Sequence, residues 1–374
     1  MLKLDSLLIL NAISGLGEVR IGKLLDFFGS PEKILAAGAQ ELSARTFLPQ
    51  RIVENIVHFP RERFLKEEYA LIQKHQIKVV TAFDPDYPEN LREIPDAPLV
   101  LYIKGTLKAE HQMAVGIVGS RRASFYGTTL AEKFAVELAQ LGITVVSGMA
   151  LGIDAAAHKG VLKVKGETIA VLGNGLSHFY PPENKDLFEK IPSFGAVVSE
   201  FPMATEPRAK HFPKRNRIIS GLSLGIVVVE ASQKSGALIT SDFALEQGRE
   251  VFAIPGKLDS PNSEGVNNLI KQGAKLVTCV EDIIEELKPR LDTYIQSAQK
   301  TRAVAETDSA DFFVKELSAQ EKFVYNLIAR DTCHLDEIVQ GAGLPTSEVM
   351  PLLLTLELKK IVKQLPGKFF VRNQ

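Results

Sequence analysis

The chain has 374 residues, of which 45% are hydrophobic and 24% charged, and its formal net charge at pH 7 is −1. At roughly 100–200 residues per domain, this length allows two or three domains, and the balanced charge excludes a molecule that is basic throughout. Its two cysteines match no metal or disulfide spacing, and no stretch approaches the ~18 apolar residues of a membrane span. We therefore expect a cytoplasmic protein without a bound metal or cofactor.

Residues 1–75 have the pattern of a helical domain. Within them, Ser14-Gly15-Leu16-Gly17 opens an amphipathic segment and resembles a helix-hairpin-helix turn, whose backbone amides can hold a phosphate. An ordinary turn between two helices explains the same residues nearly as well. Acidic and basic side chains are mixed in this region, which favours the interpretation without direct DNA contact.

A Pro-rich lead-in at 76–111 is expected to be extended and to precede a sheet domain that ends near residue 289. In that domain, short β-branched runs alternate with segments of helical length, which is typical of an open, mostly parallel sheet with helices on both faces. The runs are VGIVGS (115–120), ITVVSG (143–148), TIAVLG (168–173), AVVSE (196–200), GIVVVEA (225–231), EVFAIPG (250–256) and AKLVTC (274–279). Ligands of such α/β sheets bind beyond the carboxyl ends of the strands.

The segments that follow these strands contain small residues and cations. Small residues before a helix let backbone N–H groups approach an anion, so several such turns at one edge predict an anion site. Neither G-x-G-x-x-G nor a P-loop occurs, which argues against a dinucleotide site and an ATP-driven motor. The candidate contacts are Gly119, Ser120, Arg121, Arg122, Gly148, Phe212, Lys214, Arg215, Asn216, Arg217, Ser235, Gly236 and Thr240.

The stretch KHFPKRNRIISG (210–221) concentrates positive charge at the start of a helix that Pro213 is expected to open. A cation at this end of a helix is unfavourable by about 0.3–1 kcal/mol, so we expect bound phosphate to relieve the repulsion. Cations beside aromatic rings suit single-stranded nucleic acid, on which bases stack. Core packing explains each ring about equally well; the rings are Phe125, Tyr126, Phe179, Tyr180 and Phe212.

A polar, non-periodic segment at 290–312 is expected to be a linker to a winged-helix domain at 313–374. Three helical patterns there precede two short strands around Pro366-Gly367. The third helix has no basic residue before Lys359, which argues against base-specific readout in the DNA groove. Protein contact, or non-specific contact through the basic wing residues Lys363, Lys368 and Arg372, is the better interpretation.

The motif series identifies a resemblance that covers about 180 residues. GIVGSRRASFYG, VVSGMALGIDAAAH, AVLGNGLSHFYPPEN, SEFP, HFPKRNRIISGLS and VVVEASQKSGALITSDFALEQGREVFAIPG are similar, in this order, to motifs of the DprA/Smf family of DNA-processing proteins. The resemblance implies an extended Rossmann fold that binds single-stranded DNA without catalysis, dimerises through that domain, and loads the RecA recombinase in natural transformation. It also implies that Arg121, Lys214, Arg215 and Arg217 belong to the binding pocket.

Two alternatives remain. The fold is similar to that of LOG-type nucleoside-monophosphate phosphoribohydrolases, but the matching segment, Glu230 to Thr240, lacks their double glycine and has no further glutamate before Glu246. A sensor of a small phosphorylated nucleotide is the other. No nucleophile–base pair or carboxylate pair has a recognisable spacing, so we expect a protein that is not an enzyme and has no catalytic residues.

Overall fold

The computed structural model describes residues 2–45, 47–290, 319–328, 333–358, 362–365 and 368–372. The chain divides into two compact units, residues 1–288 and 289–374. From residue 291 onward, the expected linker lies outside the described residues.

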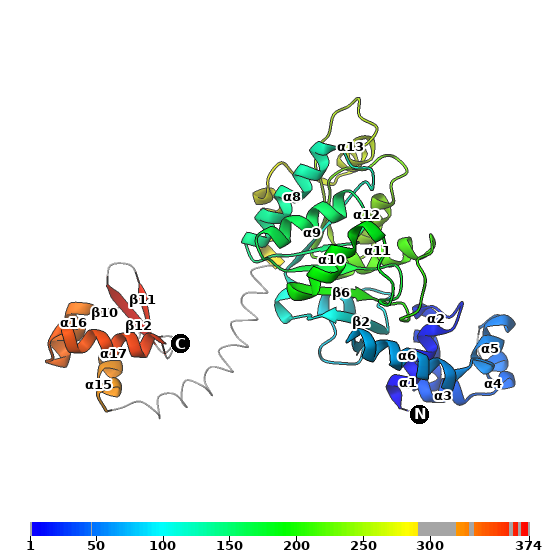
Figure 1. Cartoon of the computed structure of the whole chain (residues 1–374), viewed down its shortest axis with the longest axis horizontal. Coiled ribbons are helices and arrows are strands. Elements are labelled where there is room, and N and C mark those ends of the chain that lie inside the picture. Colours follow the sequence, from blue (N-terminus) through cyan, green and yellow to red (C-terminus); the bar gives the residue numbers. More distant parts are fainter. Residues whose placement is uncertain are drawn as a thin grey trace. The chain divides into compact units, whose positions relative to one another are not determined.

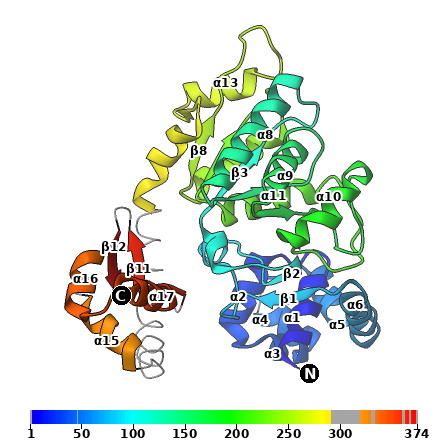
Figure 2. The same ribbon diagram turned by 60° about the vertical axis from the view of Figure 1, so that its left-hand side comes forward.

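The first unit begins with six helices, as the sequence predicts: α1 (Lys3–Ala12), α2 (Glu18–Phe28), α3 (Pro31–Ala36), α4 (Ala39–Arg45), α5 (Gln50–Val57) and α6 (Arg61–His75). They enclose an apolar core of their own, and they also pack on the sheet (Figure 2). Asn11 donates to the backbone oxygen of Glu200 over 2.8 Å, and Tyr102 donates to Glu68 over 2.6 Å. The boundary expected near residue 75 therefore falls inside one packed unit.

The described part of this unit contains a sheet in the order β1-β2-β6-β5-β4-β3-β7-β8-β9. Strands β3 to β9 are parallel to one another and coincide with the seven predicted runs. Their bounds are β3 (Ala114–Val118), β4 (Thr144–Ser147), β5 (Thr168–Val171), β6 (Gly195–Ser199), β7 (Gly225–Val228), β8 (Glu250–Ala253) and β9 (Lys275–Leu276). The chain order reverses between β3 and β7, which are neighbours at the centre of the sheet.

The segment expected to be an extended lead-in contributes two further strands and a short helix. Strand β1 (Lys78–Thr81) pairs with β2 (Val100–Gly105), and β2 adds to β6, both in antiparallel fashion. Helix α7 (Glu89–Arg92) lies between them in the sequence. The sheet is thus two strands wider than the sequence patterns predict.

Helices cover both faces of the sheet, because successive strand residues point to opposite sides. In β5, Ile169 and Val171 share one apolar core with Ile218 of α11, whereas Ala170 belongs to a second core with Leu187 of α10. Figure 1 shows the crossover helices around the sheet. They are α8 (Phe125–Gln140), α9 (Ile153–Lys163), α10 (Lys185–Lys190), α11 (His211–Leu222), α12 (Gly236–Glu246) and α13 (Glu264–Lys271). The expected α/β class with an open, mostly parallel sheet is confirmed.

The second unit is the expected winged helix. Its described elements are α15 (Ala319–Leu327), β10 (Cys333–His334), α16 (Leu335–Ala342), α17 (Thr346–Leu358), β11 (Val362–Leu365) and β12 (Phe369–Arg372). The three strands form a small antiparallel sheet, of which the sequence predicts only the last two. Pro366-Gly367 and Lys359 lie outside the described residues. Among the helices that are described, none combines the length and the apolar character that crossing a bilayer requires.

Candidate nucleic-acid interface

A cavity of about 710 Å³ opens at the carboxyl edge of the sheet, where the turns after β3 and β7 face the start of α11. This is the point at which the strand order reverses, where ligands of open α/β sheets bind. Its lining includes ten of the predicted contacts: Gly119, Ser120, Arg121, Arg122, Phe212, Arg215, Asn216, Ser235, Gly236 and Thr240. Gly148, Lys214 and Arg217, which the sequence places with them, are not part of the lining.

The turn after β3 packs closely against Ile153 and the backbone of Glu230. A Cβ on Gly119 would lie 2.6 Å from Cγ1 of Ile153 and 2.9 Å from the carbonyl oxygen of Glu230, so only glycine fits here. The Ser120 amide donates to that same carbonyl over 2.7 Å. Arg121 and Arg122 follow and are exposed, which leaves two guanidinium groups at the mouth of the cavity.

Among the helices that start near the cavity, α8 and α12 differ in their first turns. At α8, the carboxylate of Glu230 accepts from the Ser124 amide over 2.9 Å and from the Ser124 hydroxyl, so an internal anion already sits at this end. At α12, the Ser235 hydroxyl accepts from the Ala237 amide. Apart from the adjacent residues and the helix's own backbone, no atom lies within 4 Å of where a Cβ on Gly236 would be. The α12 end therefore keeps free space for an external anion beside its N–H groups.

Arg215 is buried beneath the cavity, with 4% of its surface exposed. Its Nη1 donates to the Gly148 oxygen over 2.5 Å and to the Val171 oxygen. Burial lowers the pKa of Arg215 to about 10, an effect that the nearby Asp154 carboxylate opposes. Burial also raises the pKa of Asp154, whereas Arg215 and the amides of Gly148 and Ala150 favour its charged form.

Gly148 has a structural explanation that the sequence does not reveal. A Cβ there would lie 2.6 Å from Nη2 of Arg215, so the missing side chain makes room for the guanidinium. Asp154, which accepts from the Gly148 amide over 3.1 Å, is a second residue that sequence reasoning missed. Its only signal is an acidic residue in the first turn of a helix that follows a glycine-rich turn.

Phe212 is half-buried and its ring already has neighbours. The guanidinium carbons of Arg121 and Arg215 lie 5.0 and 5.9 Å from its centroid, and the Tyr180 ring lies 5.6 Å away at an angle of 31°. These distances are those of cation–π and aromatic contacts. Phe212 therefore supports Arg121 at the cavity wall, in addition to any contact with a base.

Lys214 and Arg217 lie on another side of α11 and meet carboxylates. Lys214 Nζ is 3.0 Å from Glu18 and 3.2 Å from Glu200; Arg217, only 2% exposed, places Nη2 2.5 Å from Glu200. Arg217 Nε also lies 3.1 Å from Asp96. We call these five residues the acidic–basic cluster.

The acidic–basic cluster corrects the expectation that only bound phosphate relieves the repulsion among the basic side chains at the start of α11. The helix begins at His211, two residues before Pro213, and the chain's own carboxylates face two of its three cations. Glu18, in the first turn of α2, is 196 positions away from Lys214 in the sequence, so no local pattern predicts the contact.

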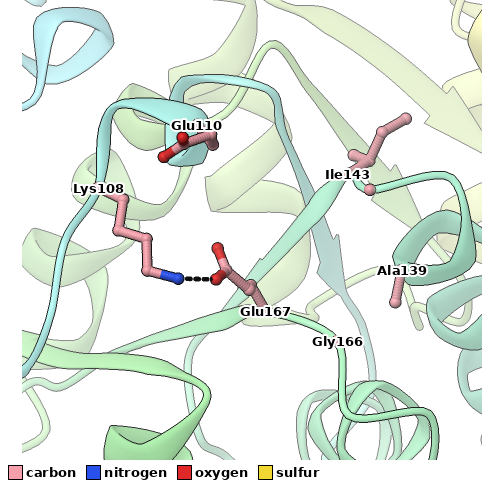
Figure 3. Close-up of a pocket in the computed structure, with 7 residues that line it drawn as sticks. Lys108, Glu110, Ala139, Ile143, Gly166 and Glu167 are labelled. Carbon is pink, nitrogen blue, oxygen red and sulfur yellow. Dashed lines mark hydrogen bonds and ion pairs between the residues drawn. The ribbon is translucent and has the colours of Figure 1, made fainter. Parts of the chain in front are cut away.

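Figure 3 shows a second cavity, of about 360 Å³, at the opposite edge of the sheet. It lies where β4 and β5 begin, beside Ile143 and Gly166. Its Glu167 carboxylate accepts from Lys108 and lies 2.6 Å from Nε2 of His111. Lys108 and Glu167, two of the charged groups that line it, are thus engaged with one another.

The cavity at the point where the strand order reverses, which we call the switch-point cavity, and the open parallel sheet define a Rossmann-type protein. The comparisons with known proteins then give the family. The family model "DNA recombination-mediator protein A" matches residues 78–288, and the model "DprA winged helix domain" matches residues 310–368. The chain belongs to the DprA/Smf family.

Relatives match most of the chain. Protein Smf of Escherichia coli is 39% identical over 326 residues, which cover 87% of this chain and 85% of the relative. The solved structure of DNA processing protein A from Streptococcus pneumoniae has a TM-score of 0.59 and 38% identity, covering 73% of this chain and 94% of its own. That of the Helicobacter pylori protein, described for its single-stranded DNA binding mode, has a TM-score of 0.52 and 28% identity, covering 57% and 97%.

Proposed function

We propose that this protein binds single-stranded DNA in the switch-point cavity. The observation that carries the proposal is the pair of exposed guanidinium groups, Arg121 and Arg122, opposite the open α12 end at Gly236. The buried positive charge of Arg215 lies beneath them and adds to the attraction for phosphate. The Helicobacter pylori relative, whose description names single-stranded DNA binding, supports the same ligand.

In this proposal, the cavity binds its ligand without chemical conversion. Glu230, in the segment that matches the phosphoribohydrolase motif, is engaged by Ser124. Asp154, which lines the cavity, accepts from the amides of Gly148 and Ala150. Incubation with AMP tests the phosphoribohydrolase alternative, because release of free adenine would establish the enzyme.

We further propose the mediator role, in which the bound strand is passed to a RecA recombinase and the protein acts as a homodimer. Membership in a family described as recombination mediators supports this role. Strand-exchange assays with RecA on DNA coated by a single-strand-binding protein test it. Acceleration by the wild type, and none by a variant that does not bind DNA, is the expected result.

Salt titration with labelled oligonucleotides tests the DNA site. Binding of single strands should weaken with a log–log slope of about −0.7 per phosphate contacted, and Arg121→Ala should reduce both affinity and slope without changing the melting temperature. Arg63→Ala removes an exposed arginine on α6 and is the matched control, expected to bind as the wild type does. Equal affinity for double strands, or a flat salt response, would refute the proposal.

A further inference from the structure

Two aromatic residues at the start of α8 are exposed although the fold does not need them. Phe125 is 88% exposed and Tyr126 60%. The side of α8 that packs on the rest of the unit is complete without them, consisting of Gly127, Ala131, Phe134, Ala135 and Leu138. Adjacent exposed rings rimmed by charge are typical of an interaction site.

These rings stand beside the cations of the cavity. Arg121 and Phe125 are four residues apart, so the chain limits the distance between their Cα atoms to about 14 Å. The turn between them is held by Glu230, which accepts from Ser124, and by Asn262, which donates to the Arg122 oxygen over 3.1 Å. The aromatic pair is therefore presented at a fixed place next to a phosphate-binding surface.

Phe212, one of two aromatic residues that line the cavity, is less available. The Phe212 ring is covered by Arg121 and Arg215 and contacts Tyr180. A base that stacks on Phe212 must displace some of these neighbours, whereas the rings of Phe125 and Tyr126 face solvent. Base–aromatic stacking needs an accessible ring face and tolerates any base.

We propose that Phe125 and Tyr126 form a base-stacking subsite, which holds unpaired nucleobases of the strand whose phosphates occupy the cavity. The inference rests on the proposed function, because it assumes that a single strand is bound there. It predicts that the strand leaves the cavity along the start of α8, where its nucleobases stack on the two rings. Neighbouring cations and continuity with the cavity favour nucleic acid over a protein partner as the occupant.

The chain contains no tryptophan, which allows a direct optical test. Phe125→Trp introduces a single indole at the subsite, and Leu141→Trp introduces one at the exposed far end of the same helix, about 24 Å away. An oligodeoxythymidine should quench the first fluorophore and leave the second unchanged. An abasic oligonucleotide of equal length should quench neither.

Alanine variants give the energetic test. Phe125→Ala and Tyr126→Ala should each weaken oligodeoxythymidine binding by roughly 5- to 150-fold, while abasic binding, salt slope and melting temperature stay unchanged. Leu141→Ala is the control. Unchanged thymidine affinity in both aromatic variants would overturn the subsite, even with DNA binding intact. Failure of the wild type to bind either oligonucleotide would instead overturn the proposed function.

Discussion

Replacing Gly148 by alanine should damage the unit from its centre. The new Cβ would lie 2.6–2.8 Å from three guanidinium atoms of Arg215, closer than real contacts allow. Arg215 would have to leave the oxygens of Gly148 and Val171, although it is buried and charged. Loss of a hydrogen bond that a charged group makes costs about 1.5–3 kcal/mol, so we expect the free energy of unfolding to fall by at least that amount.

Urea unfolding followed by circular dichroism measures this change. Gly236→Ala is the matched control, because its Cβ would meet no atom within 4 Å and alanine is the better helix former. This control should unfold at the same urea concentration as the wild type or slightly above it. If Gly148→Ala were as stable as the control, Arg215 would not depend on the space that glycine leaves, and the explanation given for Gly148 would be wrong.

Two further predictions concern pH, and urea unfolding between pH 5 and 8 measures both. Burial lowers the pKa of His158 to about 3. Below pH 6.5 the imidazole is therefore protonated in the unfolded chain but not in the folded one, which lowers the free energy of unfolding by about 2 kcal/mol at pH 5. His158→Asn should remove this loss. Burial raises the pKa of Glu200 to about 7, although Arg217 and Lys214 favour its charged form. Between pH 4.5 and 7 the carboxyl is therefore protonated in the folded state but ionised in the unfolded chain. What Glu200 adds to the free energy of unfolding is complete below pH 4.5 and falls by about 1.4 kcal/mol per pH unit up to pH 7. Glu200→Gln should flatten this second dependence. Stability curves parallel to the wild type's in either variant would contradict the corresponding prediction.

The central strands could be predicted because they are buried on both faces and therefore read as short β-branched runs. The two antiparallel strands β1 and β2 could not be predicted in this way. KVVT and VLYIKG flank a Pro-rich stretch. KVVT pairs with VLYIKG, and VLYIKG joins the sheet by pairing with β6, far along the chain. Strand β10 lies in the polar stretch DTCHLDE, which contains no apolar β-branched run.

The site was predictable where a local motif sets the geometry. The turn at Gly119 and the open start of α12 at Gly236 follow from residues within a few positions of each other. The orientation of α11 could not be predicted from nearby residues. Helical periodicity places Arg215 on a different side of the helix from Lys214 and Arg217, but it does not show which side faces the cavity. Contacts with residues far away in the sequence determine that orientation.

Helix α11 thus contacts both the cavity and the N-terminal helices, and it connects these two parts of the unit. The same turns of α11 bring Arg215 to the cavity and Arg217 to Glu18 of the N-terminal helices. A change at Glu18 of α2 would therefore remove contacts that Lys214 and Arg217 of α11 make. Removal of the first 75 residues would leave Lys214 and Arg217 without one of their counter-charges, so the surface of α11 in the shortened chain would be more positive than in the full one.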